Sequence, residues 1–332
     1  MNFSDMDFDQ SSNQPRTRFI TVKRVAMAGF LLASVAAVFV WNSGAAADRE
    51  REASVVAAID SKSLAEDEIQ SLTMADVIER ARNIRQAMSE SLHDYTATFV
   101  KQERDASGVL GEETAMQMKV QTPFRAEDGQ AAKRVFLRFV APKSQAGRKV
   151  IWGEDIYDGK MAVHEVGMLL SLKTIWLDPT GMLAMQGQRY PISEIGMIKL
   201  IEKLIERGQQ DLGNPDLKIT LKQQHDFGGT EAELLQVVRS RPSNGENDFS
   251  MAEIVLDPNR QLILQYRSFG WPDSDSESSD SESSDSESPD SESSGAEAPL
   301  LESYTYKDVE VNVGLADIDF DVKNPEYGYP AF

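Results

Sequence analysis

The side chains best suited to catalysis or metal binding are sparse in this sequence. Its three histidines are His93, His164 and His225, and none has a partner at metal-binding or catalytic spacing. Glu165 follows His164, but the second histidine of a helical zinc motif is missing. A nucleophile elbow, a phosphate-binding loop and a dinucleotide fingerprint are absent as well. The sequence therefore favours a protein without catalytic residues, metal or cofactor, although its many carboxylates leave an acid pair of the glycosidase type open.

Methionines and aromatic residues gather in the middle of the chain, between positions 152 and 197. Such side chains adapt to irregular apolar ligands, so they are consistent with an apolar binding cleft. They are equally typical of an ordinary hydrophobic core. In residues 135–139, side chains on both faces of the predicted strand are apolar, so the alternating pattern does not show which of them point inward. If a pocket exists, we expect these ligand-binding residues to line it: Phe99, Met118, Phe136, Phe139, Trp152 and Trp176.

Charge and cysteine content exclude several kinds of partner and site. The 332 residues carry a formal net charge of −20, much of it in residues 273–297, which hold ten acidic residues and no basic ones. Clustered Lys and Arg are lacking, so the composition argues against nucleic acid as a partner. The absence of cysteine excludes disulfides, thiolate zinc sites, thiol nucleophiles and a lipid-modified N-terminal cysteine.

The N-terminal region has the pattern of an export segment. Residues 1–24 form a basic lead-in, which keeps that end in the cytoplasm. Residues 25–47 then act as a signal peptide or as a single-pass anchor in the inner membrane, with an uncharged stretch at 25–41. The run Ala45–Ala47 fits a cleavage site, whereas the length of the apolar stretch fits retention. Either alternative predicts a periplasmic or otherwise extracytoplasmic location.

Residues 48–70 are expected to form a spacer, and residues 71–332 a single β-rich domain. A helix is predicted from Thr73, where a capping box with Asp76 opens an apolar stripe, to about His93. A second helix is predicted from about Pro191 to Arg207, with Pro in its first turn and Gly208 as its stop.

Short runs with strand-like alternation account for most of the remaining domain, and tight turns separate them. The predicted strands are 95–103, 115–121, 134–140, 149–152, 161–165, 172–177, 217–224, 233–239, 250–256, 262–269 and 301–311. Consecutive short strands without alternating helices indicate an α+β protein with an antiparallel sheet.

The acidic stretch at 273–297 contains four copies of a five-residue unit related to DSESS. It has uniform negative charge and almost no apolar residues, so we expect a disordered loop inserted into a late hairpin. A calcium loop is disfavoured, because Ser278 stands where that motif requires glycine.

Several motifs resemble an uncharacterised family of exported bacterial proteins. They include the run Tyr95–Glu103, Gly147–Ile151, Asp158–Lys160 and the run Tyr190–Gly196. The ending Tyr304–Phe320 is similar to the close of the outer-membrane lipoprotein carrier (LolA-like) superfamily. This resemblance implies a curved antiparallel sheet, an incomplete barrel, wrapped around helices, with a concave apolar surface that shields acyl chains. It transfers no catalytic residue.

Three functional hypotheses follow. The first is a non-enzymatic cell-envelope protein that binds an apolar ligand, a lipid or lipoprotein acyl chain, inside the half-barrel. The second is a structural or interaction module of the envelope that binds protein or polysaccharide, which a fully packed interior would favour. The third is a carboxylate-based hydrolase, which a cleft with two facing acids would favour.

Overall fold

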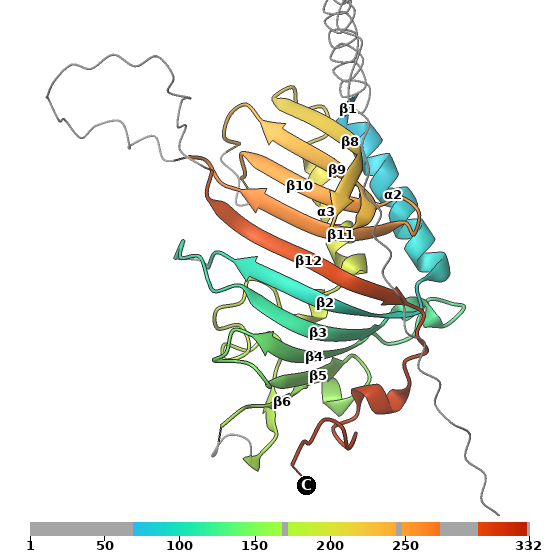
Figure 1. Ribbon diagram of the computed structural model, residues 1–332, viewed down its shortest axis with the longest axis vertical. Coiled ribbons are helices and arrows are strands. Elements are labelled where there is room, and N and C mark those ends of the chain that lie inside the picture. The colour runs from blue at the N-terminus through green and yellow to red at the C-terminus, as the bar shows by residue number, and fades with distance from the viewer. Residues whose placement is uncertain (1–68, 106, 168–171, 244–247, 273–297, 331–332) are drawn as a thin grey trace, which may run out of the picture. The chain divides into compact units, whose positions relative to one another are not determined.

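Short strands follow one another along most of the chain and pair into one sheet (Figure 1). The structure is a computed structural model, and the residues it describes are 69–105, 107–167, 172–243, 248–272 and 298–330. All of them belong to one compact unit, residues 59–332. The predicted N-terminal segments 1–24 and 25–47 and the acidic insertion 273–297 lie outside the described residues.

The described strands form a twelve-stranded antiparallel sheet in the order β1-β8-β9-β10-β11-β12-β2-β3-β4-β5-β6-β7. Their bounds are β1 Ile69–Leu72, β2 Asp94–Glu103, β3 Thr114–Gln121, β4 Arg134–Ala141, β5 Lys149–Gly153, β6 Met161–His164, β7 Ile175–Leu177, β8 Leu217–Phe227, β9 Thr230–Arg239, β10 Met251–Asp257, β11 Leu262–Phe269 and β12 Leu300–Val311. The end strands β1 and β7 do not pair with each other, so the barrel stays open. The predicted α+β class, with an incomplete antiparallel barrel around helices, is confirmed.

The first helix, α2, spans Met74–Ser91 and begins as its capping box predicts. The Thr73 hydroxyl accepts a hydrogen bond from the Asp76 amide at 3.3 Å, and the Asp76 carboxylate accepts one from the Thr73 amide at 2.8 Å. These bonds satisfy amide groups that the helix leaves without partners. One apolar side of α2, including Ile84 and Met88, is buried in the core.

The second helix, α3, spans Met197–Gln210, so the predicted start at Pro191 is wrong. Gly196, at φ 112°, occupies the position before the helix in a conformation that side-chain-bearing residues avoid. The predicted stop is wrong as well, because Gly208 lies inside α3 against α2. A Cβ atom there would sit 3.1 Å from the Ile78 side chain, so the glycine permits the close packing of the two helices.

The helices cover one face of the sheet, and the C-terminal segment covers part of the other (Figure 1). Together with the strands, α2 and α3 bury a large core on the inner face. A smaller cluster on the outer face joins β4, β5 and β6 to Phe320, Val322 and Tyr327. Both faces of β4–β6 are therefore apolar, although only one of them faces the helices.

The predicted spacer at 48–70 is too long by two residues, because Ile69 and Gln70 belong to β1. This short strand pairs with β8 through Leu72 and Ile219. Four residues are too few for alternation to reveal a strand, and its pairing partner lies far away in the sequence. Among the described residues, no helix combines the length and apolar character needed to cross a membrane.

Candidate functional site

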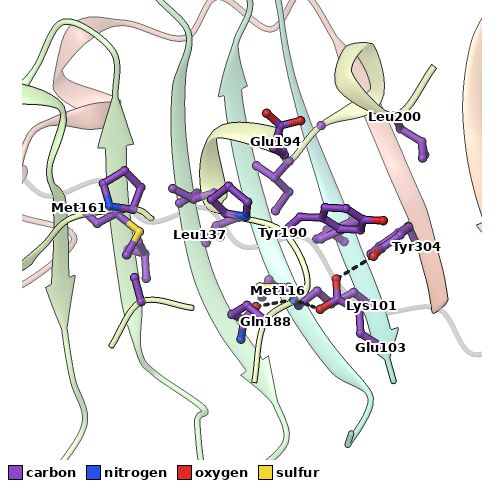
Figure 2. Close-up of a pocket in the computed structure, with 18 of the residues that line it drawn as sticks. Lys101, Glu103, Met116, Leu137, Met161, Gln188, Tyr190, Glu194, Leu200 and Tyr304 are labelled. Carbon is purple, nitrogen blue, oxygen red and sulfur yellow. Dashed lines mark hydrogen bonds and ion pairs between the residues drawn. The ribbon is translucent and has the colours of Figure 1, made fainter. Parts of the chain in front are cut away.

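A cavity of about 400 Å³ lies between the inner face of β2–β6, helix α3 and the segment that leads into α3. We call residues 177–196 the covering segment, because many of them line the cavity opposite the sheet. Figure 2 shows Lys101, Glu103 and Tyr304 toward one end of the cavity, with Leu137 and Met161 toward the other. The cavity thus has a polar end and an apolar end.

The apolar end is built by inward-facing residues of neighbouring strands. Leu137, Val150 and Val163 lie directly opposite one another on β4, β5 and β6, so their side chains form one row on the inner face. On the helix side, Leu200 and Leu204, one turn apart on α3, add further apolar lining, with Leu200 on the side of Tyr304 (Figure 2), so the row on the strands makes up the apolar end. This end presents hydrocarbon to a ligand, and such burial is favourable without any catalytic side chain.

The polar end is built by inward-facing residues near the end of β2 and the start of β12. Glu302 of β12 lies directly opposite Glu103 of β2, and Tyr304 lies opposite Lys101. The next strand adds Tyr266 beside Tyr304, with the two rings stacked at 6.4 Å between centroids. Two carboxylates therefore face each other at the cavity wall.

Cationic groups surround these carboxylates. Glu302, whose side chain is 2% exposed, pairs with Arg207 of α3 at 3.0 Å and with Arg189 at 3.6 Å. Glu103 pairs with Lys101 at 3.1 Å. The Tyr304 hydroxyl lies 2.7 Å from a Glu103 oxygen and 3.1 Å from a Glu302 oxygen, so it bridges the pair. Buried charges need such partners, because an isolated one is costly.

The Arg207 guanidinium also ties the covering segment to the sheet. It donates hydrogen bonds to the hydroxyl of Tyr190 at 2.7 Å and to that of Tyr266 at 2.9 Å. Burial opposes its charge, but the Tyr266 and Glu302 side chains outweigh burial and raise the pKa of Arg207. Burial, with Glu302 next, raises the pKa of Tyr266 and of Tyr304. Both phenols therefore stay protonated as hydrogen-bond donors at neutral pH.

The buried Lys133 anchors the last residues of the covering segment, just before α3. Its ammonium group donates hydrogen bonds to the carbonyl of Ser193 at 2.9 Å and to that of Ile195. Burial, together with the charge of Lys199, lowers the pKa of Lys133 to about 8. The amine is thus held in a place that disfavours its charged form.

This lysine predicts a pH dependence of stability. Its pKa in the folded protein, about 8, lies below the ordinary value of 10.5, so between these values the unfolded chain binds more protons. The free energy of unfolding should therefore rise with pH, by on the order of 1.5 kcal/mol from pH 8 to 9.5. Urea unfolding at each pH measures this free energy. The Lys133→Met protein should lack the rise, whereas the control Lys160→Met, at an exposed site, should keep it. An equal rise in the Lys133→Met protein would contradict this assignment.

Of the six residues expected to line a pocket, two line this cavity, Phe99 and Phe139. Met118 and Trp152 are buried in the main core but do not line the cavity. Phe136 and Trp176 contact groups of the outer-face cluster instead. Phe136 stacks on Tyr327 at 4.1 Å between centroids, and Trp176 lies 5.0 Å from Tyr157. The alternation of β4 could not show which of its apolar faces the helices cover.

The sequence-based prediction of the cavity lining did not include the polar residues of the site. A signal for them exists, because Lys101 and Glu103 have the same parity as the buried Phe99, and Glu302 has that of Tyr304 and Tyr306. Charged residues in phase with buried aromatics indicate a polar group on the inner face of a sheet. Within the described ranges, no group of three or more His, Asp or Glu residues is placed to hold a metal ion.

The fold and the cavity define a class: an open antiparallel barrel with a largely apolar chamber between sheet and helix. The chain belongs to the family described as "Protein of unknown function (DUF1571)", whose model matches residues 92–329. The sequence-based identification with an uncharacterised family is thus confirmed. The search of curated proteins found no match to the sequence.

Several solved structures are similar to the chain, all remotely. A DUF1329 family protein from Desulfovibrio piger has 11% identity and a TM-score of 0.33, with 74% of this chain and 95% of that chain covered. MucB of Pseudomonas aeruginosa, in complex with MucA, has 14% identity and a TM-score of 0.37, with 73% and 60% covered. A LolA superfamily protein from Nitrosomonas europaea has 10% identity and a TM-score of 0.25, with 73% and 97% covered.

Proposed function

We propose that this protein is a non-enzymatic binding protein of the cell envelope that holds an apolar ligand, the acyl chain of a lipid or lipoprotein. The single observation that carries the proposal is the cavity of about 400 Å³ between sheet and α3, which the protein's own side chains leave open. Its volume falls in the range of small-molecule pockets, and its apolar end suits hydrocarbon. The extracytoplasmic location rests on the apolar segment 25–41.

The polar end of the cavity suits the head of such a ligand rather than its chain. Lys101, Gln188 and Tyr190 line this end and present hydrogen-bonding groups. Because the buried carboxylates are already paired with cations, the lining offers no uncompensated charge that would demand a strongly charged head. A ligand with a long chain and a small polar end matches the two halves of the cavity.

Ligand extraction tests the proposal. We expect organic extraction of the purified full-length chain, followed by mass spectrometry, to release a bound lipid or fatty acid. After that lipid has been removed, a fluorescent fatty acid should bind with one site per chain and be displaced by unlabelled fatty acid. The absence of both extracted lipid and fatty-acid binding would overturn the proposal.

One observation favours a second candidate, a carboxylate-based hydrolase, because Glu103 and Glu302 face each other at the cavity. Such an enzyme needs one of its two acids protonated to serve as general acid. Lys101, Arg189 and Arg207 already form ion pairs with these two carboxylates, and such a network fits a structural role better than a catalytic one. Release of a cleaved product from an ester lipid or an oligosaccharide, lost in Glu103→Gln, would favour the hydrolase over the binding protein.

A further inference from the structure

The outer face of β4–β6 carries a row of cationic side chains that the cavity does not use. Arg138 lies directly opposite Lys149, and Lys149 lies directly opposite His164, so the three side chains are on one face. Thr174 continues the line toward β7, because the next residue, Ile175, pairs with Val163. Residues paired in this way have Cα atoms about 5 Å apart. We call these four residues the cationic row.

No carboxylate of the described residues neutralises this row. Neither Arg138 nor Lys149 has an ion pair or a side-chain hydrogen bond within those residues, and the adjacent positions toward the strand centres are Phe136, Ile151 and Ala162. The nearest acid in sequence, Glu165, pairs with Arg148 at 2.8 Å and lines the cavity on the opposite face. Like charges placed directly opposite one another destabilise a sheet, so the arrangement needs an explanation beyond stability.

Unmet hydrogen-bonding capacity is found at the same place. His164 Nδ1 and Thr174 Oγ1 are both buried and have no hydrogen-bond partner within the described residues. Tyr329 borders His164, with its ring edge-on at 5.2 Å between centroids. Burial, with Arg138 next, lowers the pKa of Lys149, and burial, with Lys149 next, lowers that of His164. Each group would gain from a nearby negative charge that also accepts hydrogen bonds.

We propose that the cationic row binds a phosphoryl-type oxyanion, held chiefly by Arg138 and Lys149 and completed by His164 and Thr174. A guanidinium presents paired donors that match phosphate oxygens, and an ammonium supplies a compact charge. Imidazole and hydroxyl groups donate to the same oxygens. The group comes either from free phosphate or from a phospholipid head. This site is independent of the proposed acyl-chain site, because it lies on the other face of the sheet.

Histidine resonances provide a direct test, because the chain has only three histidines. The full-length chain is labelled on histidine, and its ring signals are followed by NMR during titration with inorganic phosphate. In a separate arm, it is titrated with vesicles of phosphatidylglycerol or of phosphatidylcholine. We expect the His164 signals to shift saturably while those of His225 stay in place. A shift with phosphate identifies a free oxyanion, and one only with phosphatidylglycerol vesicles identifies a lipid head. No shift in either arm would overturn the proposal.

Variants separate this site from general charge attraction. The variants are tested with whichever probe, inorganic phosphate or phosphatidylglycerol vesicles, shifts the His164 signals. The Arg138→Gln/Lys149→Gln protein should bind this probe at least tenfold more weakly, and Thr174→Val should bind it a few-fold more weakly. Lys149→Arg, which keeps the charge, should retain most of the affinity and shows whether the position tolerates change. Lys222→Gln removes one positive charge on β8, far along the sheet from the cationic row, and should have no effect. Equal weakening in Lys222→Gln, or unchanged binding in the double variant, would refute the cationic row as the site.

Discussion

Replacing Arg207 with methionine should lower the free energy of unfolding by about 3–4 kcal/mol, measured by urea unfolding at pH 7. The substitution leaves Glu302, whose side chain is 2% exposed, with a single more distant cation, Arg189 at 3.6 Å. It also removes the hydrogen bonds that Arg207 donates to Tyr190 and Tyr266. The loss is large because a buried carboxylate without its partner keeps its desolvation cost and loses the compensating attraction.

Two further variants distinguish the loss of the buried ion pair from a loss of packing. Arg241 pairs with Asp216 at 2.7 Å, but its side chain is 71% exposed, so Arg241→Met should cost less than about 1 kcal/mol. Adding Glu302→Gln to Arg207→Met removes the buried charge and should restore part of the lost stability. If Arg207→Met costs no more than Arg241→Met, the network at the polar end does not hold the covering segment to the sheet.

Most strands of the domain could be predicted from the sequence alone, because short apolar or alternating runs stand between recognisable turns. Strand β11, Leu262–Phe269, has the bounds that its pattern predicts. The start of α3 shows where local rules fail. Pro191 satisfies the preference for proline in a first turn, yet the helix begins at Met197. There its first amide donates to the hydroxyl of Tyr95 on β2, a long-range contact that no local pattern reveals.

The candidate site was only partly predictable for a related reason. Alternation shows that Phe136 and Phe139 lie on opposite faces of β4, but not which face the helices cover. The second apolar face exists because Tyr327 returns to pack on Phe136, and that segment is almost two hundred positions away. The charged pair Glu103 and Glu302 comes from strands equally far apart, and only their register places them opposite each other. The roles of residues 25–47 and 273–297 stay predictions.

Filling the cavity should weaken acyl-chain binding without unfolding the protein. Leu200 on α3 lines the cavity and is partly exposed, so the larger side chain of a tryptophan there can extend into the cavity. We expect Leu200→Trp to weaken binding of a fluorescent fatty acid at least tenfold, because excluding about two methylenes from the cavity loses roughly 1.6 kcal/mol. Its free energy of unfolding should stay within about 1 kcal/mol of that of the unmodified protein, since no packed group is displaced.

The same substitution outside the cavity serves as the control. Leu212, just beyond α3, is 60% exposed and does not line the cavity, so Leu212→Trp should leave fatty-acid affinity unchanged. Leu200→Ala enlarges the chamber and should alter affinity only a few-fold. Unchanged affinity in a folded Leu200→Trp protein would show that the fatty acid binds elsewhere, because an acyl chain in the cavity must compete with the added indole for the same space.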